Sequence, residues 1–505
     1  MRRGLGAGRR IDRFDLLVLV AFAGVSLWIL GLDVWQVVAH GRSWTGTDGV
    51  LPEDQMQYLA WIRAVSQHGL ASNLFVLRST PADYFQPVIE LSGGVTALGV
   101  APWLALLMWK PVAVAAAFLA VRAYVRRSIA GRWPRRAALV LALFYGFFGV
   151  GPDLWLGFWT WGYPFELLAL AAMLGSLLAY DRAGRAGRVS WSAPLLGALA
   201  ASLHPWQGEE LIAIVIVAEL VTSAAGARRV ALPAMTVVAT AVPLAYYAVL
   251  DRADSSWRLG QLASRGTASL SRVALELAPL ALASALAYRR RPRTFIDAAT
   301  RTWPLAALGV FLLSETRFGE TPLHAFAAIS VPLAVLALEG AGGRRSLGGS
   351  LRGLILGALA VAALTIPAGA YELSSAAKLA TPTAGDPNFI TRDESAALAF
   401  LARERRPGGV LTRFYLGTVV PAETGRRTFV GNCYWSQPDC SGRARITEEL
   451  LQGSLSPRAA RRLVRSSGAR FVLSDCDTRA DLLELLGPIV GSVHRFGCAA
   501  VYVIR

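Results

Sequence analysis

The chain has 505 residues, of which 54% are hydrophobic and 17% charged, and its mean hydropathy is +0.44. Soluble domains carry about a quarter charged residues, so this composition excludes an ordinary soluble protein. The formal net charge of +17 would favour nucleic acid as the partner of a soluble protein. Here the arginines lie in short loops between apolar runs, so topology explains them and no nucleic acid is expected. Lysine occurs only at Lys110 and Lys378, which indicates a GC-rich, bacterial genome.

The arginines mark one side of a membrane. They cluster at residues 2–13, 122–136, 182–188, 228–229, 289–293 and 344–352. Cytoplasmic loops retain arginine and lysine, so these clusters predict the inside. The intervening loops are rich in aromatic, carboxylate and histidine side chains, which places the candidate chemistry on the outer face.

The apolar runs predict about eleven membrane-spanning helices, since a hydrocarbon core needs about 20 apolar residues per helix. The expected spans are residues 14–38, 102–122, 137–150, 164–180, 192–203, 208–224, 230–250, 270–288, 302–314, 324–340 and 352–370. An odd count puts the N-terminus in the cytoplasm and the C-terminus outside. The expected fold is a polytopic α-helical membrane protein in which residues 1–371 form the transmembrane domain. Its first outer loop, residues 40–101, is long.

Residues 372–505 have a different character, and we expect a small extracytoplasmic α/β domain. Strands are predicted at 409–413, 427–431, 470–475 and 499–504, and helices at 392–406, 446–453 and 456–468. Four cysteines, all in this segment, allow three pairings. We favour Cys433–Cys440, which closes a short loop, and Cys476–Cys498, which joins two strand ends. Oxidised pairs fit an extracytoplasmic location. Free thiols or a zinc site are the alternatives, although the paired CxxC spacing of zinc ribbons is missing.

The first outer loop contains the acidic pair Glu53 and Asp54, followed by apolar residues at helical spacing. The pair is therefore expected at a helix start, where the macrodipole favours an anion. The alternative is that the two carboxylates only cap the helix, and we give the two interpretations equal weight.

Three further outer loops carry candidate site residues. The second loop holds Asp153, Trp159 and Trp161, and stacked aromatic rings beside carboxylates suit a sugar ring; an interfacial hairpin is the alternative. The third is the His204-Pro205-Trp206-Gln207 motif with Glu209, a carboxylate that is costly at a membrane span unless it is solvated or paired. The fourth holds Arg317 and His324, and a lone outer arginine suits a phosphate unless it only pairs with Glu315 or Glu320. Arg258, in another outer loop, is the next phosphate candidate.

The acidic motif PEDQMQYLAW, the short outer hairpins and the tail stretch FYLGTVVPAETGRRTFVGNCYWSQPD together resemble the GT-C superfamily of polytopic membrane glycosyltransferases. That class includes protein O-mannosyltransferases and the aminoarabinose transferase of lipid A. The resemblance implies a polyprenyl-phosphate-linked sugar donor and an envelope glycan, lipid or protein as acceptor. It makes Asp54 the general base or acceptor-orienting residue, with Glu53 as the alternative. No cofactor is expected, and a metal is not favoured.

The sequence therefore predicts an inverting sugar transferase of the bacterial plasma membrane. Arg317, His324 and Arg258 would bind the donor phosphate, and Asp153, Trp159, Trp161, His204, Trp206 and Glu209 would line the sugar pocket. A transporter or flippase of an envelope lipid or sugar is the alternative, because polar residues at membrane level also mark transport paths. Walker, GxSxG, HExxH and Rossmann patterns are missing from fitting contexts, which argues against nucleotide chemistry.

Overall fold

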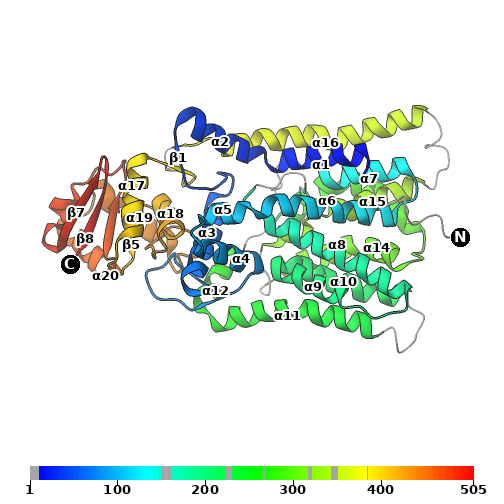
Figure 1. The fold of residues 1–505 in the computed structure, drawn as a ribbon, viewed down its shortest axis with the longest axis horizontal. Helices are drawn as coiled ribbons and strands as arrows, with labels where there is room; N and C mark the ends of the chain where they lie inside the picture. The colour runs from blue at the N-terminus through cyan, green and yellow to red at the C-terminus, as the bar shows by residue number, and fades with distance from the viewer. Residues whose placement is uncertain are drawn as a thin grey trace.

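The computed structural model describes residues 11–146, 148, 154, 156, 161–222, 230–265, 268–316, 321–342, 351–383 and 385–505. Most of these residues form a bundle of long helices, and a small sheet with its own helices lies at one end of the bundle (Figure 1). The region that contains this sheet, residues 389–505, is called the C-terminal region below.

Seven helical segments among the described residues are long and apolar enough to cross a membrane. The first two helices, α1 (Arg13–Ser26) and α2 (Trp28–His40), form an eighth if their 50° bend lies within one span. The seven segments comprise α5 (Pro102–Leu107) with α6 (Trp109–Ser128), α8 (Pro164–Arg185), α11 (Ala231–Ala253), α13 (Leu270–Ala285) with η3 (Leu286–Arg289), α14 (Phe295–Ser314), η4 (Pro322–Phe326) with α15 (Ser330–Gly342), and α16 (Leu351–Leu379). The chain is thus a multi-pass membrane protein.

The other three expected spans overlap helices that are too short or too charged to count as membrane-spanning by length and composition. Helices α7 (Arg132–Phe144) and α9 (Ser192–Leu203) are short, and α10 (Pro205–Thr222) carries three carboxylates. The count of eleven spans therefore stays a prediction. The expected domain boundary at residue 371 also stays a prediction. It falls inside α16, which ends at Leu379.

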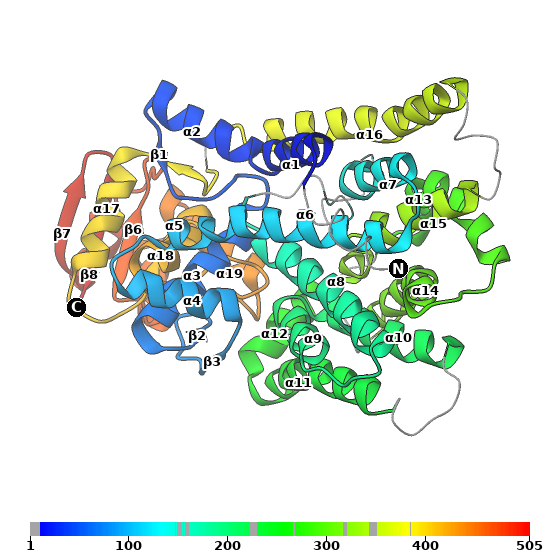
Figure 2. The same ribbon diagram turned by 45° about the vertical axis from the view of Figure 1, so that its right-hand side comes forward.

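The first outer loop folds into short elements that cover one end of the bundle. It begins with β1 (Ser43–Trp44) and contains α3 (Pro52–His68), β2 (Ala71–Ser72), β3 (Ala82–Tyr84) and α4 (Pro87–Ala97). Strand β1 pairs with β4 (Phe389–Ile390), which ties this loop to the C-terminal region. Between α11 and α13, the helix α12 (Ser255–Ser264) lies at the same end of the bundle (Figure 2).

The C-terminal region contains a four-stranded sheet in the order β5-β6-β8-β7. Its strands are β5 (Val410–Leu411), β6 (Phe471–Ser474), β7 (Val490–Phe496) and β8 (Ala499–Ile504), and its helices are α17 (Arg392–Arg403), α18 (Phe414–Thr424), α19 (Cys440–Gln452), α20 (Pro457–Ser467) and α21 (Leu482–Leu486), followed by η5 (Gly487–Ile489). The pair β5–β6 is parallel, and β8 is antiparallel to both of its neighbours. The strand expected at 427–431 is reduced to an isolated bridge between Thr428 and Val410.

The two-residue alternation of the strands determines which face meets the bundle. Phe471 and Leu473 belong to a core shared with Trp61 of α3, whereas Val472 packs on the opposite face with Leu450 and Val464. One face of the sheet thus closes the core of the C-terminal region, and the other face joins it to the first outer loop.

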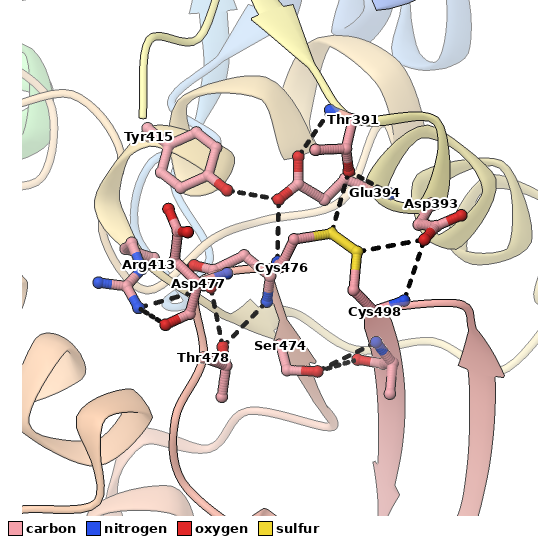
Figure 3. The surroundings of a disulfide bond; sticks show 12 residues. Thr391, Asp393, Glu394, Arg413, Tyr415, Ser474, Cys476, Asp477, Thr478 and Cys498 are labelled. Atoms are coloured by element: carbon pink, nitrogen blue, oxygen red, sulfur yellow. Dashed lines mark hydrogen bonds and ion pairs between the residues drawn. A yellow bond between two sulfur atoms is a disulfide. The ribbon is translucent and has the colours of Figure 1, made fainter. Parts of the chain in front are cut away.

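The cysteines pair as Cys433–Cys440 and Cys476–Cys498, which is the favoured pairing of the four. Figure 3 shows the second bond at the start of α17. There Glu394 accepts hydrogen bonds from the Tyr415 hydroxyl at 2.6 Å and from the Cys476 amide at 3.1 Å. The disulfide and this carboxylate together fix α17 against the ends of β6 and β8.

Candidate active site

A cavity of about 650 Å³ lies where the bundle, the first outer loop and the C-terminal region meet. It is lined from α3, the start of α8, the α9–α10 turn, α11, α12, η4 and the Cys433–Cys440 loop. Five residues that the sequence predicted for the site are among its lining: Asp54, His204, Trp206, Glu209 and His324. Residues from Leu51 to Trp435 thus share one cavity, and polar groups that converge on a cavity are typical of a binding site.

Asp54 lies in the first turn of α3, which begins at Pro52. The N-cap residue is Leu51, so neither Glu53 nor Asp54 caps the helix. Asp54 lines the cavity, whereas Glu53 does not, and this separates the two candidates for the base. Burial, and then the negative charge of Asp54, raise the pKa of Glu53.

Tyr163 fixes the orientation of the Asp54 carboxylate. Its hydroxyl donates a hydrogen bond of 2.9 Å to Asp54 Oδ2, and its ring meets the Tyr58 ring edge-on at 5.5 Å. Burial, and then the charge of Asp54, raise the pKa of the Tyr163 phenol well above its usual range. The phenol therefore keeps its proton and remains a donor to the carboxylate.

The loop before α8 is held in place by Asp48, a buried residue that sequence reasoning missed. Asp48 accepts the amide of Val50 at 3.0 Å and that of Gly162 at 3.4 Å, and its own amide donates to Gln55 at 2.7 Å. A side chain at Gly162 would begin 1.9 Å from the Gln55 amide nitrogen, so only glycine allows this approach. These contacts set Tyr163 opposite Asp54.

Two histidines and a tryptophan form a second wall. The ring of His204 lies 5.2 Å from that of His324 in a stacked arrangement, and Trp206 meets His324 edge-on at 4.5 Å. His204 follows the last turn of α9, and Trp206 lies in the first turn of α10. The short His-Pro-Trp turn therefore brings two rings to the cavity.

A third wall is aromatic and comes in part from the C-terminal region. Trp435, inside the Cys433–Cys440 loop, lies 5.1 Å from Trp257 and 5.3 Å from Trp61 between ring centroids. Its indole N–H donates to Gln57, and its carbonyl accepts from Asn73 at 2.9 Å. No local pattern predicts that this loop reaches α3, since Trp435 and Gln57 are 378 residues apart.

Three phosphate-binding residues were expected at the site, and the structure describes two of them. His324 lines the cavity, whereas Arg258 is exposed on α12 and is not among the lining residues. Arg317 lies outside the described residues. Arg252, near the end of α11, and Arg265, just after α12, line the cavity instead. Both lie between the expected spans 230–250 and 270–288, in the same outer loop as Arg258, and that position was the available signal.

Of the aromatic residues predicted for the second outer loop, the structure describes Trp161, and it does not line the cavity. Trp161 is fully buried and absent from the lining, and its indole N–H donates to Asp33 on α2 at 2.9 Å. It packs edge-on against Trp44 at 5.7 Å. Asp153 and Trp159 lie outside the described residues. Trp161 therefore anchors the loop that precedes Tyr163 and does not face the cavity.

Among the described residues, one group of potential metal ligands gathers closely: Asp393, Cys476 and Cys498. Both of its sulfur atoms are joined in a disulfide. A disulfide offers no thiolate, so this group does not fit a metal ion.

No known protein-family model matches the sequence, and no curated protein matches it. Solved structures do match the fold. The apo oligosaccharyltransferase of Archaeoglobus fulgidus aligns with 95% of this chain and 73% of its own, at 14% identity and a TM-score of 0.57. The AglB oligosaccharyltransferase of the same organism, in complex with an inhibitory peptide and a dolichol-phosphate, aligns with 92% and 70% at 13% identity and a TM-score of 0.56.

A third structure, ArnT from Cupriavidus metallidurans bound to undecaprenyl phosphate, aligns with 97% of both chains at 15% identity and a TM-score of 0.51. Identities this low establish the fold alone. The chain is a polytopic membrane protein whose fold is similar to that of GT-C superfamily glycosyltransferases.

Proposed function

We propose that this protein is an inverting glycosyltransferase that takes a sugar from a polyprenyl-phosphate donor and transfers it to a cell-envelope acceptor. The observation that carries the proposal is the cavity itself, where Asp54 lies in one enclosure with two arginines, two histidines and a wall of aromatic rings. The similar folds of AglB and ArnT, whose structures contain dolichol-phosphate and undecaprenyl phosphate, support the same class of donor.

The chemistry needs a base on one side of the anomeric carbon and cations on the other. Asp54 would accept the proton of the acceptor hydroxyl while the oxygen of that hydroxyl forms a bond to the anomeric carbon. The bond from that carbon to the phosphate oxygen breaks, and the phosphate leaves with the electron pair. Arg252 and Arg265 would stabilise the negative charge on the departing phosphate. Arg317, which lies outside the described residues, stays a candidate for the same role. The tryptophans that line the cavity would pack against the C–H face of the sugar ring.

We further propose a bacterial plasma-membrane location, with the N-terminus in the cytoplasm and residues 372–505 outside. The arginine-rich turn between α6 and α7 lies at the end of the bundle away from the C-terminal region (Figure 1), as the positive-inside rule requires. The two disulfides fit an oxidising compartment on the other side. A reporter fused to the C-terminus and found active only in the cytoplasm would contradict this orientation.

The direct test uses the purified full-length protein in nanodiscs with a panel of polyprenyl-phosphate sugars. Release of undecaprenyl phosphate, measured by mass spectrometry, reports transfer. Asp54→Asn keeps the size of the side chain but removes the base, so the rate should fall by about 10²–10⁴-fold while the melting temperature stays close to wild type. A folded variant with full transfer would reduce Asp54 to a residue of the first helical turn.

The same preparation distinguishes transfer from transport. A labelled lipid-linked sugar that crosses the bilayer of proteoliposomes without cleavage of its phosphate bond would replace the transferase proposal with a flippase. Cleavage that depends on Asp54 supports the transferase.

A further inference from the structure

The start of α1, the last turns of α6 and the first turns of α7 come together at the end of the bundle away from the C-terminal region (Figure 2). A second cavity lies between them. It has a volume of about 80 Å³. Five arginines and two aspartates line it, namely Arg122, Arg126, Arg132, Arg135, Arg136, Asp12 and Asp15, with Val125 and Leu139. We call it the arginine pocket.

Ion pairs hold part of this pocket in a fixed shape. The Asp15 carboxylate accepts from Arg122 at 2.8 Å and from Arg126 at 2.9 Å, and Asp12 accepts from Arg136 at 3.2 Å. The Arg122 side chain is only 9% exposed. Three guanidinium groups are thus oriented by two carboxylates and cannot simply extend into water.

The pocket has more positive charge than its carboxylates can balance. Five arginines against two aspartates leave a formal charge of +3. Arg132 and Arg135 add guanidinium groups without adding a carboxylate, and the Arg135 Nε–H donates to the Ile129 carbonyl at 2.6 Å. Guanidinium groups that converge on one small cavity favour an anion that accepts several hydrogen bonds at once.

The start of α7 adds a second attraction for an anion. The helix begins at Arg132 after Gly131, and no side chain caps its first amides. An uncapped helix N-terminus carries partial positive charge and favours phosphate. Trp133, in the same turn, is 55% exposed and lies 5.1 Å from the Arg136 guanidinium, as an aromatic residue at the membrane interface would.

We infer that the arginine pocket binds the phosphate of an acidic phospholipid headgroup. Its volume is that of about two or three water molecules, which suits a phosphate group and not a larger polar molecule. Its place at the ends of apolar helices is the level of lipid headgroups, and basic pockets between such helices bind acidic lipids. Arginines that served topology alone would spread into water and would not be paired around a common cavity.

The test uses the full-length protein in a neutral detergent with three probes: dioleoyl-phosphatidylglycerol, dioleoyl-phosphatidylcholine and inorganic phosphate. Native mass spectrometry counts retained lipids, and thermal unfolding follows each titration. The variant Arg132→Ala/Arg135→Ala removes two guanidinium groups and leaves the three ion pairs intact. Arg188→Ala, an exposed arginine after α8, is the matched control.

Phosphatidylglycerol should be retained by the wild type and raise its melting temperature, whereas phosphatidylcholine should not. The double variant should bind phosphatidylglycerol on the order of tenfold or more weakly, and Arg188→Ala should match the wild type. Equal loss in the control, or no difference between the two lipids, would overturn the inference. Inorganic phosphate that stabilises the wild type equally at millimolar concentration would uphold a phosphate site but overturn its lipid source. If the alanine variant fails to fold, Arg132→Lys/Arg135→Lys keeps both charges but lacks the bidentate fork, so it should retain only part of the lipid effect. A folded lysine variant that binds phosphatidylglycerol no differently from phosphatidylcholine, or as tightly as the wild type, would overturn the role of the two guanidinium groups.

Discussion

Tyr163→Phe tests whether Asp54 acts as an oriented base. The substitution removes one hydroxyl that donates to Asp54 Oδ2 at 2.9 Å and keeps the buried ring that meets Tyr58. A hydrogen bond to a charged group contributes about 1.5–3 kcal/mol. If that contribution is spent on positioning the carboxylate in the transition state, transfer should slow by about 10–150-fold, because each 1.36 kcal/mol is tenfold in rate.

A double-mutant cycle separates this role from a structural one. In an Asp54→Asn background the amide is no longer a base, so the tyrosine has nothing catalytic left to orient. Tyr163→Phe should then cost little further activity, and the coupling energy should equal nearly the whole cost of the single variant. The assay is release of undecaprenyl phosphate by the purified variants, with the melting temperature measured on the same samples.

Tyr247→Phe is the matched control. Tyr247 also lines the cavity, but its hydroxyl donates to the Ser202 carbonyl at 2.9 Å and not to Asp54. Its effect should therefore add to that of Asp54→Asn without coupling. Additive losses for Tyr163→Phe as well would refute the proposed orientation and leave Tyr163 as a packing residue.

Three further predictions concern stability and donor binding. Replacing Cys476 and Cys498 by serine opens a loop of sequence separation 22 and should lower the free energy of unfolding of the C-terminal region by about 3 kcal/mol in the chain-entropy model, measured by denaturant unfolding with and without reductant. Because folding raises the pKa of Glu53, its contribution is fully present below the ordinary value of 4.5 and lost as pH rises through the folded pKa. Glu53→Gln should therefore raise the melting temperature at pH 8 relative to wild type but not at pH 4, and equal shifts at both pH values would contradict this. Arg317→Ala should weaken binding of undecaprenyl phosphate, and Arg317→Lys should restore it in part because lysine lacks the bidentate fork; lowered stability with unchanged affinity would make Arg317 structural.

The helices were predictable because a helix that crosses lipid needs about 20 mostly apolar residues. Each expected span overlaps a helix of the structure. The number of membrane-spanning helices was harder to predict from hydropathy, because α10 contains Glu209, Glu210 and Glu219 within an otherwise apolar helix. Packing explains part of this: Glu210 accepts from Trp303 at 2.7 Å, and Glu219 accepts from Tyr180 at 2.8 Å. Such partners lie on other helices, and hydropathy cannot reveal them.

The site was predictable where residue type and loop position were enough. The acidic motif and its resemblance to GT-C enzymes pointed to Asp54, and the outer loops between expected spans pointed to His204 and His324; all three line the cavity. Direction within a loop was not predictable. Trp161 and Arg258 belong to the expected loops, yet Trp161 is buried against Asp33, and Arg258 is exposed and does not line the cavity.

The C-terminal region completes the cavity. Tyr434 and Trp435 belong to a loop of sequence separation 7 that is closed by the Cys433–Cys440 disulfide. Trp435 reaches Trp61 and Trp257, and Gly260 of α12 lies so close that a side chain there would begin 2.8 Å from the Trp435 ring.

The C-terminal region therefore supplies one wall of the cavity that Asp54 lines, where Trp435 packs against Trp61 of α3 and Trp257 of α12. Excluding water from a site strengthens every electrostatic interaction inside it. By this argument the aromatic contact at Trp435 couples folding of the C-terminal region to the chemistry proposed for Asp54. It also explains why the first outer loop and the C-terminal region share one hydrophobic core.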